Sequence, residues 1–117
     1  MKNYFIINPV AGQGKAIEIV EKQIEIVSEE LKKDNEFIII HTHHPGDGTE
    51  ICKEICEENK DQVINVFACG GDGTCFEVLN GYRLNGIFKR ESHLISHSSF
   101  QGQCHHDHLP FLYLVLA

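Results

Sequence analysis

The stretch that decides the fold is VINVFACGGDGT, residues 63–74. It opens with seven mostly apolar residues, a pattern typical of a strand buried on both faces of a parallel sheet. Three glycines within four positions follow, and a helical pattern begins at Thr74. Glycine lets backbone amides approach a ligand, and the N-terminus of a helix attracts negative charge. A strand, glycine loop and helix in this order therefore favour a phosphate-binding site.

Two similar units precede this stretch. Short apolar runs at residues 4–7 and 37–40 predict two further strands of the same buried kind. Residues 16–31 carry apolar side chains at three- and four-residue steps, which predicts one amphipathic helix. A second helix follows the second strand, with Thr49 as its expected cap.

The third helix is predicted to be short, from residue 74 to about residue 79, with Asn80 and Gly81 as its stop. The resulting order is βαβαβα. It predicts an α/β fold, a three-layer, parallel, doubly wound sheet with right-handed crossovers. Ligands of such sheets bind beyond the carboxyl ends of the strands, where both glycine loops of this chain are expected.

Composition limits the possible partners. The 117 residues make one domain at most, with a net charge of −7 and a pI of about 5.5. This charge argues against a nucleic-acid partner and against electrostatic docking on anionic lipid. The N-terminus lacks a signal peptide, and no apolar run is long enough for a transmembrane segment. The five cysteines form no C-x-x-C pair, so we expect reduced thiols and a cytoplasmic protein.

Asp72 is the unusual member of the glycine loop, because a carboxylate stands where phosphates would bind. A carboxylate at this position is explained if Asp72 holds Mg²⁺, directly or through water, or if it polarises an acceptor hydroxyl. The alternative is a tight strand-to-helix turn in which Asp72 only caps the helix.

The first loop, residues 8–15, also joins a strand to a helix. It is not a Walker A loop, since Pro9 replaces a required glycine and Ala16 follows Lys15. Lys15 could still reach a phosphate, and Asn8 could bridge neighbouring loops. A plain loop with one exposed lysine remains the alternative.

Thr42 ends the second strand, so three strand-end loops with small or hydroxyl-bearing residues are predicted to face one crevice. His41, His43 and His44 flank it, but they lack the spacing and the fourth partner of a metal site.

These motifs together resemble the catalytic domain of the diacylglycerol kinase and sphingosine kinase family, and the bacterial soluble lipid kinases most of all. The resemblance rests on FIINPVAGQGK at residues 5–15, Thr42 with Gly46-Asp47, GGDGT at 70–74, and EVLNG at 77–81. It covers residues 3 to about 81. It implies transfer of the γ-phosphoryl of ATP, with Mg²⁺, to the hydroxyl of a lipid such as diacylglycerol.

The resemblance maps the nucleotide contacts onto the glycine loop and Thr42, with Asn8 supporting the site. Asp72 is the expected catalytic residue and the contact of Mg²⁺. The expected ATP-binding residues are Asn8, Pro9, Gly12, Gly14, Lys15, Thr42, Gly70, Gly71, Asp72, Gly73, Thr74, Cys75 and Phe76.

Two departures from the family pattern stand out. Phe76 occupies a position where the family usually has asparagine, and no G-T-G-N-D-type loop or second, β-sandwich domain follows Gly86. We therefore expect residues 1–86 to be a partial ATP-binding catalytic domain. Residues 87–117 are expected to be an atypical, irregular tail, disordered or frameshifted, and the chain to be inactive as it stands.

Two alternatives stay open. NAD kinase shares the glycine–aspartate loop but generally lacks the Asn8-to-Lys15 segment, so an NAD kinase-like fragment is the second enzyme class. A non-catalytic nucleotide-binding module is the third possibility. The sequence names neither the lipid nor the oligomeric state.

Overall fold

The computed structural model describes residues 1–60, 62–84, 92–101 and 108–116, with the backbone alone for Asp72, for residues 83–84 and for the last two segments. The elements, in chain order, are β1 (Lys2–Ile7), α1 (Ala11–Gly14), α2 (Ala16–Glu25), α3 (Glu29–Asp34), β2 (Glu36–His41), α4 (Asp47–Glu58), β3 (Ile64–Cys69), α5 (Asp72–Leu84), β4 (Ser92–Gln101) and β5 (His108–Leu116).

The sheet has the strand order β2-β1-β3-β5-β4, and its first three strands are parallel. Ile7 at the end of β1 pairs with His41 of β2 and with Cys69 of β3. The three strands therefore end at the same level, and the loops that follow them begin side by side. The prediction of an α/β fold with a parallel sheet is confirmed.

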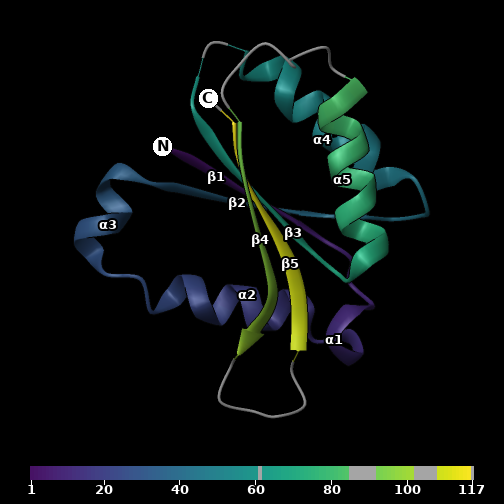
Figure 1. Ribbon diagram of the computed structural model, residues 1–117. Helices are drawn as coiled ribbons and strands as arrows, with labels where there is room; N and C mark the ends of the chain where they lie inside the picture. Colours follow the sequence, from purple (N-terminus) through teal and green to yellow (C-terminus); the bar gives the residue numbers. More distant parts are fainter. Residues whose placement is uncertain (61, 85–91, 102–107, 117) are drawn as a thin grey trace.

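Helices cover both faces of this sheet (Figure 1). On one face Tyr4 and Ile6 pack with buried residues of α4 and α5, such as Cys52 and Val78. On the other face Ile7 packs with α2 in a smaller cluster. This arrangement gives the three layers that the sequence predicts. Among the described helices, none is long and apolar enough to cross a membrane.

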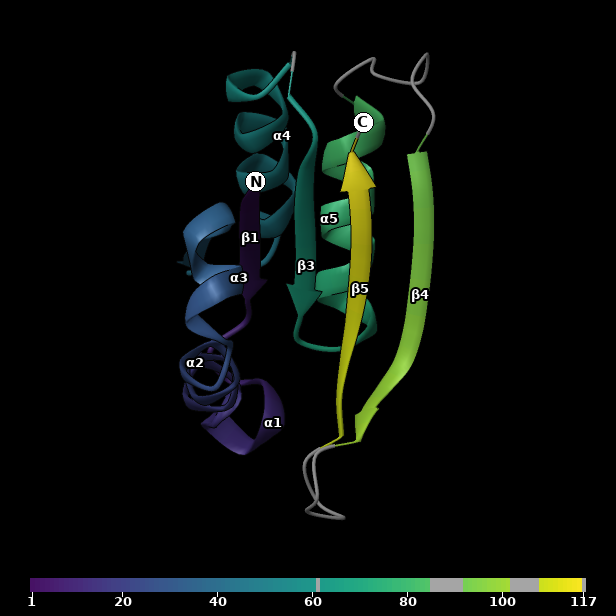
Figure 2. The same cartoon turned by 90° about the vertical axis from the view of Figure 1, so that its left-hand side faces the viewer.

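An antiparallel hairpin extends the sheet beyond β3. β5 pairs with β3, and β4 lies outside β5 at the edge (Figure 2). The sequence predicts an irregular tail over residues 87–117, whereas the structure describes two strands within it, over residues 92–101 and 108–116. Strand pairing is made by backbone groups that any sequence carries, and the open edge of β3 presents a row of them.

The helix predicted over residues 16–31 is two helices. α2 ends at Glu25, and α3 begins at Glu29. The Ser28 hydroxyl accepts a hydrogen bond from the Leu31 N–H at 3.3 Å and caps the second helix. The apolar period continues through the break, and the cap explains why the chain turns there.

Thr49 does not cap the helix that follows β2. That helix, α4, begins two residues earlier, after Gly46 in the left-handed conformation (φ 89°). Thr49 lies in its first turn, and its hydroxyl donates to the Glu77 carbonyl at 2.8 Å. The prediction was wrong because a threonine hydroxyl can form a hydrogen bond with a neighbouring helix instead of capping its own.

Gly81 does not end the third helix. α5 runs through Asn80 and Gly81 to Leu84. A Cβ at Gly81 would lie 2.8 Å from the Cys52 Cβ and would collide with the Thr49 carbonyl. The glycine is therefore explained by the close packing of α5 against α4.

Candidate functional site

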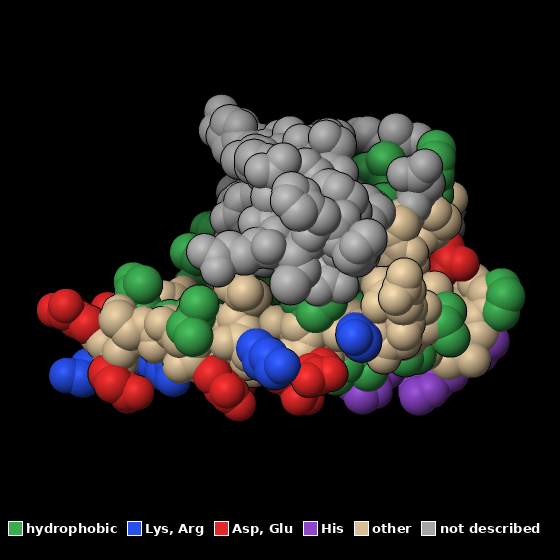
Figure 3. All heavy atoms as spheres, turned by 90° about the horizontal axis from the view of Figure 1, so that it is seen from below, with side chains coloured by type: hydrophobic (Ala, Val, Ile, Leu, Met, Phe, Trp, Pro, Cys, Tyr) green, Lys and Arg blue, Asp and Glu red, His purple; other side chains and the backbone are tan. Residues whose placement is uncertain are grey.

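A cleft of about 400 Å³ opens at the carboxyl ends of β1, β2 and β3. Each of these strands contributes the loop that follows it, as expected for a doubly wound sheet. The lining residues are Asn8, Pro9, Val10, Thr42, His43, His44, Pro45, Gly70, Gly73, Thr74 and Glu77. Figure 3 views the molecule from this end.

The glycine loop forms the floor of the cleft. Gly71 has a φ of 92°, a left-handed conformation that side chains rarely adopt. The first hydrogen bond of α5 runs from the Cys75 N–H to the Gly71 carbonyl at 3.1 Å. The amides of residues 72–74 precede it, and the first amides of a helix have no partner within the helix. The floor therefore presents backbone N–H groups and the positive end of a helix dipole.

Gly70 lets the first loop approach the glycine loop. A Cβ at this position would lie 2.6 Å from the Thr74 Oγ1 and 2.7 Å from the Asn8 Cβ. Thr74 is buried, and its hydroxyl donates to the Gly70 carbonyl at 3.4 Å. Any side chain at residue 70 would force these groups apart.

Asn8 joins the two loops. Its N–H donates to the Cys69 carbonyl at 2.9 Å, and its Oδ1 accepts from the Val10 N–H at 3.2 Å. Burial and, to a smaller extent, the nearby Cys75 together raise the pKa of the Cys69 thiol to about 12. A thiol with a raised pKa stays neutral at physiological pH, so Cys69 adds no negative charge beneath the cleft.

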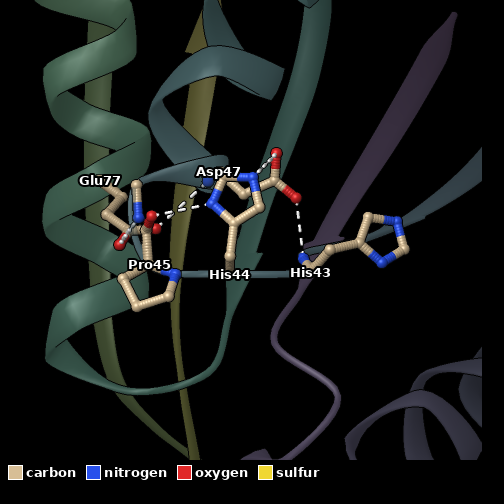
Figure 4. Close-up of polar contacts among 7 residues, drawn as sticks. His43, His44, Pro45, Asp47 and Glu77 are labelled. Carbon is tan, nitrogen blue, oxygen red and sulfur yellow. Dashed lines mark hydrogen bonds and ion pairs between the residues drawn. The ribbon is translucent and has the colours of Figure 1, made fainter.

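Glu77 fastens the wall opposite the first loop. Its Oε1 accepts from the Gly46 N–H at 2.7 Å, and its Oε2 accepts from the Gly48 N–H at 3.2 Å (Figure 4). A carboxylate on α5 therefore meets the amides at the start of α4, where negative charge is favourable. These bonds hold the loop between β2 and α4 against the first turns of α5.

Asp47 orders the same loop from within. Its Oδ2 accepts from the His43 N–H at 2.8 Å, and its Oδ1 lies 3.8 Å from the His44 Nε2. In Figure 4 the His44 ring faces the Asp47 carboxylate, whereas the His43 ring extends away from it. The His44 Nδ1 lies 2.9 Å from the Pro45 carbonyl oxygen, so both ring nitrogens have a polar neighbour.

The structure brings part of the predicted ATP site together. The predicted residues that line the cleft are Asn8, Pro9, Thr42, Gly70, Gly73 and Thr74. Gly71 shapes the loop without lining the cleft. The side chain of Asp72, the predicted catalytic and Mg²⁺-binding residue, lies outside the described part of the molecule.

Other predicted residues lie away from the cleft. Gly12, Gly14 and Lys15 do not line it, and Lys15 is exposed. Cys75 is partly buried and packs against the core on the α4 side of the sheet. Phe76 is 66% exposed and does not line the cleft.

Several cleft residues were not predicted as site residues. These are Val10, His43, His44, Pro45 and Glu77. The motif EVLNG includes Glu77, and the histidines were noted only as flanking residues. The loop that carries the histidines reaches the cleft because Glu77, 31 positions away in sequence, holds it there. Such a contact depends on the folded chain, and local pattern does not reveal it.

Among the residues whose side chains are described, no three His, Cys, Asp or Glu side chains gather to hold a metal ion. Both carboxylate oxygens of Glu77 are already engaged by amides. This donor set fits a Mg²⁺ ion that enters with phosphates better than one held by protein ligands alone.

Residues 2–93 match the family described as the diacylglycerol kinase catalytic domain. The chain is 31% identical over 80 residues to "Putative lipid kinase YtlR" of Bacillus subtilis (strain 168), an alignment that covers 68% of this chain and 25% of that protein. A solved structure titled "A putative diacylglycerol kinase from Bacillus anthracis str. Sterne" is 35% identical, with a TM-score of 0.45, over 68% of this chain and 26% of that one.

The chain therefore spans about a quarter of the length of these relatives. The family match takes in all four motifs of the sequence and continues to residue 93, past the end of α5. The cleft residues of β1, β2 and β3 all lie inside it. This chain belongs to the diacylglycerol kinase catalytic domain family.

Proposed function

We propose that the cleft binds the phosphates of ATP and that the chain is the nucleotide-binding part of an ATP-dependent lipid kinase. The observation that carries this proposal is the glycine loop, whose amides open α5 at the floor of a cleft shared by three strand ends. Family membership supports the reaction class, and the geometry of the loop supports the role of these residues.

Backbone amides can hold the phosphates without lysine or arginine. Each charge-assisted hydrogen bond to such an amide contributes about 1.5–3 kcal/mol. Three of them, together with the α5 dipole, would hold a polyphosphate on a protein of net charge −7. Asn8 and Thr42 would then contact the ribose or the outer phosphates from the neighbouring loops.

Mg²⁺ would be held by the ATP phosphates and by Asp72, and it would neutralise charge on the transferred group. The lipid hydroxyl oxygen forms the new bond to the γ-phosphorus, and the bond from that phosphorus to the ADP oxygen breaks. We propose that the Asp72 carboxylate takes the hydroxyl proton. Glu77 has a positioning role, since it holds the cleft wall through α4.

Transfer to a lipid such as diacylglycerol is proposed for the complete family architecture. Phosphoryl transfer depends on positioning and charge stabilisation from several sides. The 117-residue chain spans about a quarter of its relatives, so we propose that by itself it binds ATP without measurable transfer.

The test is titration of the full chain with ATP, with and without Mg²⁺, by calorimetry. We expect Gly71→Val to abolish binding, because a branched side chain at a φ of 92° forces the loop to rearrange. Gly14→Val is the matched control, since Gly14 has a similar φ of 81° and equally open surroundings but lies off the cleft. Asp72→Ala is expected to keep binding and to lose its response to Mg²⁺.

Equal ATP affinity in Gly71→Val and the unmodified chain would refute the assignment of the loop. Circular dichroism of each variant separates loss of the site from loss of the fold. Binding without transfer when diacylglycerol vesicles are added is the expected result for this chain. Transfer of phosphate to the lipid would contradict the proposal that the chain alone is inactive.

A further inference from the structure

The charge of the cleft needs an explanation. Among the lining residues that the structure describes no lysine or arginine occurs, and their ionisable side chains are those of His43, His44 and Glu77. In Figure 3 the described histidine side chains lie along the lower edge, right of the centre, and lysine side chains extend from the left to just beside them. The imidazoles are therefore the side chains of the described wall that can bring positive charge to a bound anion.

The His44 ring is positioned by polar groups at both of its nitrogens. Its Nε2 lies 3.8 Å from the Asp47 Oδ1, and its Nδ1 lies 2.9 Å from the Pro45 carbonyl oxygen. Asp47 is itself fixed, since its other oxygen accepts from the His43 N–H. A neutral His44 leaves the Asp47 carboxylate uncompensated beside the cleft, and a protonated His44 offsets it.

The charged groups around the histidines come from three elements. Asp47 belongs to α4, Glu77 belongs to α5, and the histidines themselves belong to the loop after β2. When both imidazoles are neutral, the charged side chains described at this wall are the carboxylates of Asp47 and Glu77. With both imidazoles protonated, two positive charges balance them. Repulsion of a phosphate chain therefore falls as the histidines gain protons.

We propose that His43 and His44 are phosphate-binding residues of the cleft and that their protonation tightens the binding of ATP. The inference rests on the proposed function and adds to it two side chains, those of His43 and His44, that become positively charged when protonated. His43, whose ring extends away from Asp47, would contact phosphate oxygens directly, and His44 would act through its ion pair.

The sign of the pH dependence follows from linkage. Imidazole is the side chain that ordinarily changes charge between about pH 5 and pH 8. A bound anion favours the protonated form, so affinity rises as pH falls through this window and levels off below it. Each imidazole whose protonation the ligand favours by a factor of ten contributes up to about tenfold in affinity.

The experiment compares ATP dissociation constants at about pH 5.5 and about pH 8. The proteins are the full chain, the double variant His43→Gln/His44→Gln, and His41→Gln as the matched control. His41 is exposed at the end of β2 and does not line the cleft. ATP titrates in the same pH range, so the quantity of interest is the ratio of the variant's constant to that of the unmodified chain.

We expect this ratio to be at least about tenfold larger at the lower pH for the double variant, and to be unchanged for His41→Gln. The variant His43→Lys/His44→Lys, with fixed charges, should bind ATP tightly at both pH values. Tripolyphosphate should reproduce the pattern and adenosine should not, because the interaction is with phosphate.

A ratio for the double variant that is constant across pH would overturn the histidine proposal and leave the ATP proposal standing. A folded chain that binds ATP at neither pH would overturn both. Circular dichroism at each pH shows which proteins are folded.

Discussion

The two walls of the cleft are built differently. The wall after β2 is tied down by Glu77, which accepts from the Gly46 and Gly48 amides, and by Asp47, which accepts from the His43 N–H. The loop after β1 continues into three successive left-handed residues, Gly12, Gln13 and Gly14, and no side chain caps α1 or α2. One wall is held by carboxylates of α4 and α5. The other is held by short-range backbone hydrogen bonds and by the Asn8 side chain, and so has less support from side chains of other elements.

This difference indicates that the two walls have different roles in binding a ligand. Preorganised dipoles and charges stabilise a ligand without the cost of ordering them. The supported wall and the glycine floor are therefore suited to grip phosphates. The less supported loop is suited to adjust to the rest of the ligand. The following changes test that division, beginning with the largest expected effect.

Glu77→Ala removes both fastenings of the supported wall. The loss of two charge-assisted bonds is expected to lower the free energy of unfolding by about 3 kcal/mol and to weaken ATP binding at least tenfold. Urea denaturation and calorimetry measure the two effects. Glu77→Gln keeps one oxygen acceptor and should fall in between. If Glu77→Ala binds ATP like the unmodified chain, the wall is not held by this side chain.

Gly81→Ala tests the packing of α5 on α4 behind the same wall. A methyl group there would meet Thr49 and Cys52, and overpacking of this kind costs about 1–3 kcal/mol. Gly73→Ala in the same helix is the control, because nothing lies within 4 Å of its added carbon, and it should be neutral or stabilising. Thermal unfolding compares the two. Equal melting temperatures would show that the helices can move apart.

Gln13→Gly tests the strain of the less supported loop. Gln13 has a φ of 60°, and a left-handed conformation costs a residue other than glycine about 1–2 kcal/mol. The greater freedom of glycine in the unfolded chain offsets part of this, so we expect a net stabilisation of up to about 1 kcal/mol. A lower free energy of unfolding, measured in urea, would show that Gln13 makes contacts that outweigh its strain.

Lys15→Ala has the smallest expected effect. Lys15 is exposed and does not line the cleft, so screening leaves it little influence, and ATP affinity should change by no more than about twofold. A tenfold loss would mean that the first loop closes over the ligand. In that case the sequence-based assignment of Lys15 to the ATP site would be right, and both walls of the cleft would contact the ligand closely.

The sequence was informative where one local pattern decides the structure. The buried runs at residues 4–7, 37–40 and 63–69 predicted three parallel strands, and Gly70 and Thr74 were placed in the cleft from the order of strand, loop and helix. These predictions need only a strand period and the chemistry of glycine.

The sequence was uninformative where the structure depends on contacts between residues that are far apart in the chain. The sequence predicts Gly81 as a helix stop, but Gly81 lies within α5 where that helix packs closely against α4. It predicts Thr49 as a helix cap, but the Thr49 hydroxyl donates a hydrogen bond to the Glu77 carbonyl. Glu77 itself became a site residue only through bonds to amides 29 and 31 positions away. Contacts of this kind depend on how α4 and α5 meet, which no local pattern encodes.

The most direct test of the central claim is an amide NMR titration of the full chain with ATP. If the glycine floor grips the phosphates, the largest shifts of backbone N–H signals will occur at residues 70–74, with smaller ones at 42–46. Signals of residues 12–15 will move little. Large shifts elsewhere with an unchanged glycine loop, or no shifts at saturating ATP in a folded chain, would contradict the account.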